Sequence, residues 1–269
     1  MVTTQQRHSE AGEVAQMESM TKVRMNVEIC ESKVATGLRA SAAGADIIRK
    51  AIDERGAANV IMATGISQFD MLNDLVAAPG IDWSKVTGFH LDEYAGIPAT
   101  HPASFRLYLK ERFLDKLPRP IGAFHFIEGD RELETERRRI SDIIRQHPID
   151  LCFLGIGENG HVAFNEPPAD FQTEDPYIIV HLDDISRKQQ LDQGWFASMD
   201  EVPTLAISMS VRQLMKSRNL ICTATGPRKT VVVKNTVKGP ITPNVPASIL
   251  QEHPGVTLLL DPESAKLLD

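Results

Sequence analysis

The sequence has few cysteines and no long apolar run. Its cysteines, Cys30, Cys152 and Cys222, are odd in number and far apart, which argues against a disulfide framework. Two of them lie in apolar runs and predict buried, reduced thiols, which are typical of a cytosolic protein. No stretch approaches the roughly 20 apolar residues of a membrane-spanning helix. We therefore expect a cytoplasmic protein that does not cross a membrane.

The chain also has no excess of positive charge. Its 269 residues include 29 Lys and Arg against 36 Asp and Glu, which gives a net charge of −7. This balance argues against nucleic-acid binding, which usually needs a basic face, although a few local donors would suffice for a small anionic ligand. No spacing of His, Cys, Asp or Glu resembles a zinc or EF-hand site, so we expect no required metal.

The sequence alternates between strand and helix patterns from residue 25 onward, whereas residues 1–24 lack a signal-peptide core and are expected to form a flexible lead-in. The expected strands are 25–29, 58–63, 86–91, 124–127, 149–153, 177–181, 204–209, 219–224 and 256–260. The expected helices are 32–54, 69–76, 103–116, 130–146, 184–193, 225–237 and 246–250. This alternation predicts one α/β domain over 25–269, a single doubly wound (Rossmann-like), mostly parallel sheet with helices on both faces.

The most informative stretch is 154–167, LGIGENGHVAFNEP. It follows an expected buried strand and is rich in glycine, and ligands of open α/β sheets bind at the carboxyl ends of strands. His161 in this loop can give and take a proton near neutral pH, and Glu166 could orient its ring. A loop histidine is more often an ordinary surface residue, but the glycine-rich strand end favours a functional one.

Three other strand ends add groups that we expect on the same rim. Thr64, Gly65 and Ser67 join a strand to a helix, where backbone N–H groups can bind an anion; a plain βα turn is the alternative. Asp92 ends another strand, where partial burial raises a carboxyl pKa and suits a proton-transfer base; a helix-capping acid is the alternative. Lys229 opens a later helix and would place a positive charge near a phosphate, unless it is simply solvated.

Together these blocks resemble the glucosamine-6-phosphate deaminase (isomerase) family, in the superfamily that includes 6-phosphogluconolactonase. Residues 155–167 look like the family's signature loop, and LDEYAGIP at 91–98 with HPASF at 101–105 looks like its second block. GPRK at 226–229 and PASILQEHP at 246–254 are similar to its C-terminal blocks, and the resemblance covers about residues 28–265. The lactonases typically have Ser or Thr where 164–167 stands, which favours the deaminase branch.

The resemblance implies an enzyme of amino sugar metabolism, in N-acetylglucosamine catabolism. It would convert glucosamine 6-phosphate, or a related hexosamine phosphate, to fructose 6-phosphate, or a related ketose phosphate, and ammonia. The implied catalytic group comprises Asp92, which moves a proton from C2 to C1, and the ring-opening group His161, Glu166 and Asn159. The implied phosphate-binding residues are Thr64, Gly65, Ser67 and Lys229. The implied partner is a small-molecule sugar phosphate, no cofactor is implied, and a homo-oligomer is left open.

The sequence departs from the family pattern at three places. Asn159 stands where the family usually has Asp, so His161 should be less basic unless Glu158 compensates. Restoring Asp there is expected to raise the rate of ring opening if the substrate is the family's own. Gly194 stands where the family often has a phosphate-binding arginine, for which Arg187 is a candidate substitute. The phosphate loop at 65–68 also differs. These departures leave the exact sugar open.

Two other functions remain open from the sequence. A lactonase of the same superfamily would hydrolyse an ester and release no ammonia. A non-catalytic sugar-phosphate sensor would keep the fold and the phosphate site, and Asn159 is the residue that raises this alternative.

Overall fold

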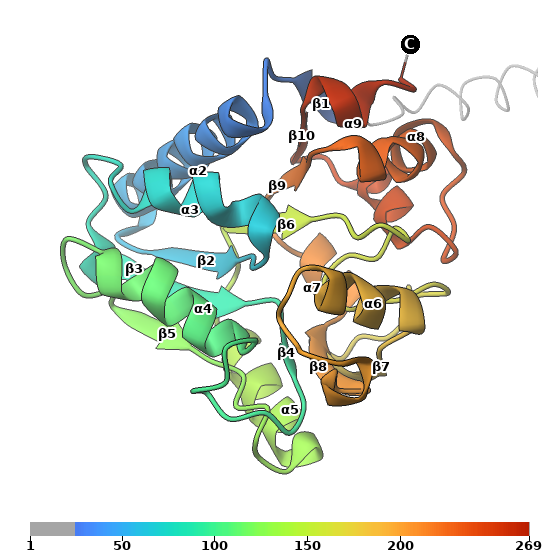
Figure 1. Ribbon diagram of the computed structural model, residues 1–269. Helices are drawn as coiled ribbons and strands as arrows, with labels where there is room; N and C mark the ends of the chain where they lie inside the picture. Colours follow the sequence, from blue (N-terminus) through green and yellow to red (C-terminus); the bar gives the residue numbers. More distant parts are fainter. Residues whose placement is uncertain (1–24, 269) are drawn as a thin grey trace, which may run out of the picture.

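The computed structural model describes residues 25–268, so the expected lead-in at 1–24 lies outside the described residues. Seven strands form a central sheet in which every neighbouring pair is parallel (Figure 1). In spatial order they are β1 (Asn26–Ile29), β10 (Val256–Leu260), β9 (Asn219–Ala224), β6 (Leu151–Gly155), β2 (Ala58–Met62), β3 (Val86–His90) and β5 (Ala123–His125). The predicted doubly wound parallel sheet is therefore confirmed.

The strand order reverses direction in the middle of the sheet. From β2 the chain moves outward through β3 to β5, whereas β6, β9 and β10 follow one another toward the opposite edge. The switch point lies between β2 and β6, and the crevice outside the carboxyl ends at such a point is where open α/β sheets bind ligands.

Helices cover both faces of this sheet. The described helices are α2 (Lys33–Arg55), α3 (Phe69–Leu75), α4 (Phe105–Arg112), α5 (Leu133–Ile144), α6 (Asp184–Asp192), α7 (Val211–Met215), α8 (Thr230–Lys238) and α9 (Pro262–Ala265), and five of them lie on the sheet. Right-handed crossovers place α2, α3 and α4 on one face, because their connections run in one direction across the sheet, and α5 and α8 on the other (Figure 1). The expected helix at 246–250 is a 3₁₀ helix, η6 (Pro246–Glu252).

A second, smaller sheet modifies the prediction. Strands β4 (Asp92–Tyr94), β8 (Leu205–Met209) and β7 (Tyr177–His181) pair antiparallel, apart from the main sheet. The strands expected at 177–181 and 204–209 are therefore present but do not extend the parallel sheet. Asp92 is also not the end of strand β3; it begins β4, because the chain leaves the main sheet at Leu91, whose carbonyl accepts the Met209 N–H at 2.7 Å.

An aromatic cluster packs the small sheet against neighbouring loops. Tyr94 of β4 lies 5.0 Å from Phe105 and 5.3 Å from Phe164 between ring centroids, and Phe196 meets it edge-on at 5.5 Å. All four rings are buried. This cluster holds β4 beside the carboxyl end of the main sheet, the edge at which a ligand is expected. Among residues 25–268, no helix is both long and apolar enough to span a membrane.

Helix α2 contacts the sheet so closely that one position requires glycine. A Cβ atom at Gly44 would overlap the ring of Phe153 on β6. We predict that Gly44→Ala lowers the free energy of unfolding, because overpacking costs about 1–3 kcal/mol and outweighs a helix-propensity gain of up to about 1 kcal/mol. Urea unfolding measures the change. Adding Phe153→Leu should recover part of the loss, and a Gly44→Ala protein as stable as the parent would contradict this packing.

Candidate active site at the switch point

A cavity of about 440 Å³ opens at the carboxyl edge of the main sheet. Its walls include most of the predicted site residues: Thr64, Gly65, Ser67, Asp92, His161 and Lys229. They come from the loops after β2, β6 and β9 and from the start of β4. The volume lies within the roughly 300–1,000 Å³ of small-molecule sites. The structure therefore brings these side chains together on one rim, as the sequence predicted.

Two similar glycine turns form the floor of the cavity. Gly65 after β2 (φ 98°, ψ 166°) and Gly226 after β9 (φ 90°, ψ 162°) each precede a 3₁₀ turn that runs into a helix, α3 or α8. A positive φ favours glycine at both places. The buried amide of Gln68 links the two turns, because it donates to Thr223 Oγ1 of β9 at 2.9 Å. Helix starts of this kind suit a phosphate.

Lys229 adds a cation to this floor. Burial lowers the pKa of its amine to about 8, although the negative charge of Glu158 opposes this shift. The neighbouring Arg228 also disfavours the ammonium form and pairs loosely with Glu158, at 3.5 Å. An amine with this pKa is mostly charged at neutral pH and is poorly compensated inside the protein, so it is suited to an anionic ligand.

Asp92 faces the cavity from the other side. It is 6% exposed, and no hydrogen bond within the described part of the chain engages its carboxylate. Burial raises its pKa well above the usual value, and the nearby carboxylates Glu93 and Glu166 raise it further. A carboxylate with these properties is a stronger base than an exposed one and is free to accept a proton from a bound molecule.

The His161 ring lies next to a matched set of polar groups. Its Nδ1 is 3.0 Å from Ser186 Oγ and 3.4 Å from Glu166 Oε2. The ring lies against the backbone of Gly157, where any Cβ would overlap it. No hydrogen bond between described residues engages Nε2, and His161 lines the cavity. One ring nitrogen is thus held by the protein, and the other is left for a ligand.

Glu166 stays ionised beside this histidine. Burial opposes its ionisation, but the neighbouring polar groups of His161, Ser186 and Asn159 outweigh burial and hold its pKa below the usual value. Asp92 and Glu166 thus have pKa values shifted in opposite directions, which is a common arrangement of acid–base groups in enzymes.

Comparison with known proteins identifies the family of this chain. Residues 31–259 match the family described as glucosamine-6-phosphate isomerases/6-phosphogluconolactonase. The chain belongs to this family. It is 36% identical over 245 residues to a glucosamine-6-phosphate deaminase of Oenococcus oeni, an alignment that covers 91% of this chain and 99% of that protein. It is also 36% identical over 217 residues to a glucosamine-6-phosphate deaminase of Streptococcus pneumoniae, covering 80% of this chain and 88% of the relative.

Solved structures of the same superfamily share the fold. One, a monomeric glucosamine-6-phosphate deaminase of the NagB superfamily, matches with a TM-score of 0.82 and 29% identity over 90% of this chain and 100% of its own. A 6-phosphogluconolactonase from Shewanella baltica matches with a TM-score of 0.73 and 17% identity, covering 89% of this chain and 99% of that one. The second likeness concerns the fold alone.

Arg187 does not fill the place of the arginine that the family pattern has at Gly194. Its guanidinium donates to the carbonyls of Met199 at 2.8 Å and Val202 at 3.1 Å, and it is not among the groups that line the cavity. The same helix, α6, instead presents Gln189 and Gln190 to the cavity, and Gln193 at its C-cap also lines it. The proposed substitution by Arg187 is therefore wrong, because this side chain anchors the loop after α6.

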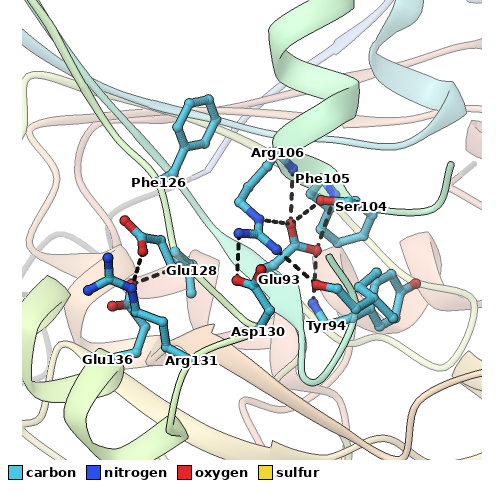
Figure 2. Close-up of polar contacts among 12 residues, drawn as sticks. Glu93, Tyr94, Ser104, Phe105, Arg106, Phe126, Glu128, Asp130, Arg131 and Glu136 are labelled. Carbon is cyan, nitrogen blue, oxygen red and sulfur yellow. Dashed lines mark hydrogen bonds and ion pairs between the residues drawn. The ribbon is translucent and has the colours of Figure 1, made fainter. Parts of the chain in front are cut away.

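Sequence reasoning also missed the support of Asp92. The neighbouring Glu93 is fully buried and accepts hydrogen bonds from Ser104 Oγ at 2.7 Å and from the backbone N–H groups of Phe105 and Arg106 at 3.1 and 3.0 Å (Figure 2). Arg106 also pairs with Asp130 at 2.8 Å. These bonds tie β4 to the first turn of α4. The HPASF block contains the sequence signal, since a Ser before an apolar run often marks a helix start. Here the Glu93 carboxylate, and not the Ser104 hydroxyl, accepts the free N–H groups of that start.

No group of three or more His, Cys, Asp or Glu side chains in residues 25–268 is arranged to hold a metal ion. The cysteines Cys152 and Cys222 are buried free thiols, as predicted, and Cys30 is partly buried.

The raised pKa of Asp92 has a consequence for the pH dependence of the protein's stability. A carboxyl whose pKa is higher in the folded than in the unfolded state destabilises the fold at pH values above the unfolded pKa. We expect Asp92→Asn to raise the melting temperature at pH 7 by at least about 2 °C, with the gain disappearing as the pH falls below about 4. Asp46→Asn on the exposed side of α2 is the control and should show little change. A lower melting temperature for Asp92→Asn at pH 7 would contradict the pKa direction.

Proposed function

We propose that this protein is an aminosugar-phosphate deaminase that converts glucosamine 6-phosphate, or a related hexosamine phosphate, and water to a ketose phosphate and ammonia. The observation that carries the proposal is the pairing, across one cavity, of an unengaged carboxylate with a raised pKa, Asp92, and a histidine held at Nδ1, His161. Relatives named glucosamine-6-phosphate deaminase that are 34–36% identical support the same activity.

The residues divide into two working groups around the bound sugar. The glycine turns at Thr64–Ser67 and Gly226 with Lys229 would hold the phosphate through backbone N–H groups and a cation. His161, kept in place by Glu166, would move the proton of the C1 hydroxyl to the ring oxygen and open the ring.

Asp92 would then carry out the isomerisation. Its carboxylate takes the proton from C2 of the open aldose while the C1 oxygen gains a proton from solvent, which gives an enolamine. The carboxyl then returns its proton to C1 while the amine releases one to solvent, which gives an imine at C2. Water adds to this imine and ammonia leaves, so the ketone forms without any change in oxidation state over the whole reaction. A base with a raised pKa is suited to removing a weakly acidic carbon proton. No step requires a cofactor.

Gln190 is a candidate for choosing among hexosamine phosphates. It is 8% exposed, lines the cavity, and its side-chain amide makes no hydrogen bond to another described residue. A neutral amide in the wall can form a hydrogen bond with a sugar hydroxyl, but it binds a phosphate more weakly than an arginine does. We assign this wall to the sugar and the glycine turns to the phosphate. The free thiols are consistent with a reducing compartment, the cytoplasm.

An ammonia assay tests the activity directly. With glucosamine 6-phosphate, we expect ammonia and fructose 6-phosphate in equal amounts, and Asp92→Asn should lower kcat at least about 10²-fold because the general base is lost. Asp46→Asn serves as the control. Fast hydrolysis of 6-phosphogluconolactone without ammonia release would favour the lactonase, and tight sugar-phosphate binding with no turnover of any hexosamine phosphate would favour the sensor.

Lys229 should give a pH dependence of its own. Because the pKa of its amine is lowered to about 8, the free enzyme loses this charge above that pH, and kcat/KM for the phosphorylated substrate should fall by up to about tenfold per pH unit there. Lys229→Arg keeps its charge, since arginine stays protonated, so its profile from pH 7 to 9 should lack this fall. Identical profiles for the two proteins would remove Lys229 from the phosphate site.

A further inference from the structure

The Asn159 carboxamide lies between two carboxylates. Its Nδ2 donates to Glu166 Oε2 at 2.6 Å and to Asp183 Oδ2 at 2.9 Å, and its Oδ1 accepts the backbone N–H of His161 at 3.0 Å. Carboxylates can only accept hydrogen bonds, so the amide nitrogen must face them and the orientation of the carboxamide is fixed. Both hydrogens of Nδ2 are therefore used to join two negative groups.

Helix α6 begins at this same place. Asp183 is its N-cap, and Oδ1 accepts the Ser186 N–H at 2.6 Å, while Oδ2 accepts from Asn159. Ser186, which is 1% exposed, places its Oγ 3.0 Å from His161 Nδ1. The first turn of α6 thus touches the histidine group at two points, through the Asn159 amide and through the Ser186 hydroxyl.

The hydrogen-bond directions around Ser186 are consistent with one tautomer of His161. His161 Nδ1 lies 3.4 Å from Glu166 Oε2, which can only accept, and 3.0 Å from Ser186 Oγ, which can also accept. Nδ1 then carries the hydrogen, and in the neutral ring Nε2 has a free lone pair. This is the form that accepts a proton from a bound sugar hydroxyl.

We propose that Asp183 and Ser186 are positioning residues for His161, and that Asp183 supplies the second carboxylate that the family pattern places at position 159. This inference rests on the proposed function only for the role of His161. The family pattern has carboxylates at 159 and 166, and this chain has Glu166 and Asp183 with the Asn159 amide between them. The second carboxylate is thus supplied by the N-cap of α6, Asp183, and not by the loop residue at 159.

This arrangement reverses the expectation drawn from the sequence for Asn159→Asp. An aspartate at 159 would remove both donors and add a third carboxylate within hydrogen-bond distance of Glu166 and Asp183. Like charges in a buried site cannot all ionise, so Glu166 would be protonated or displaced.

The test compares Asn159→Asp, Asp183→Asn and the double variant by kcat and KM for ammonia release. We expect Asn159→Asp to lower kcat about tenfold or more, the scale of lost support for a functional histidine, with KM changed less than about threefold because the phosphate floor is untouched. The double variant, which exchanges the charge and the amide, should recover kcat to within about threefold of the parent. Asn244→Asp on an exposed loop is the matched control and should leave kcat unchanged.

If Asn159→Asp does not fold, the variants Ser186→Ala and Asp183→Asn test the positioning role instead. Both keep the start of α6, since Asn caps helices as well as Asp, and each should lower kcat with little change in KM. Parental kcat in both variants, an Asn159→Asp protein at least as active as the parent, or a double variant no better than Asn159→Asp would each overturn the proposal.

Melting temperatures give a readout that needs no turnover. The double variant should melt about 4 °C or more above the value expected from adding the two single changes. If the parent releases no ammonia but this coupling is found, the proposed function fails while the pairing of positions 159 and 183 stands. Additive melting temperatures would refute the pairing, even in an active deaminase.

Discussion

Buried negative charge is the constraint on which this site depends. Asp92, Glu93 and Glu166 are all buried or nearly so, and Asp183 joins them through the Asn159 amide. Each buried carboxylate needs donors or must give up its charge. Glu93 receives them from the start of α4 and Glu166 from Asn159, with His161 Nδ1 3.4 Å away, whereas Asp92 receives none from residues 25–268. The fold therefore distributes its donors unequally, and the one carboxylate left without them is the one that faces the cavity.

The backbone donors to Glu93 come from a helix start, and the phosphate floor is built at two others. In a parallel sheet every strand points its carboxyl end toward the same edge, and each following helix begins there with free N–H groups. The first turns of α3, α4, α6 and α8 all lie around this edge. Burying a cluster of carboxylates beside a phosphate site costs less free energy at this edge, where N–H groups are available, than it would at the opposite edge.

Much of this arrangement could be predicted from the sequence because it depends on local pattern. The βα units of the main sheet, the glycine turn at Gly65 and the strand-end loop with His161 all follow from periodicity and glycine placement. The small antiparallel sheet could not be predicted in this way, because the strand pattern of 177–181 does not specify its neighbour. The sequence predicts Asp92 at the end of a strand, whereas the Leu91–Met209 hydrogen bond and the pairing of Asp92 with Ser208 show that it starts another.

The contacts made by Asn159 and Arg187 could not be predicted for a different reason. In the sequence, Asn159 indicates the loss of a carboxylate, because its partner Asp183 is 24 residues away in the chain. Arg187 has the right charge and lies close in sequence to the position that needed one, but the turn of the helix aims its guanidinium at the Met199 and Val202 carbonyls. The contacts of both residues depend on the direction in which the side chain points, and spacing along the chain does not determine that direction.

The division of the site between two sheets has a geometric consequence. The glycine turns that would hold the phosphate follow strands of the large parallel sheet, whereas Asp92 belongs to the small sheet, and the two are joined at Leu91. In the proposed reaction, the separation between the two sheets fixes the distance from the phosphorus atom to the carbon that loses its proton. A phosphorylated sugar one carbon shorter would be held by the same floor and would present the wrong carbon to the base.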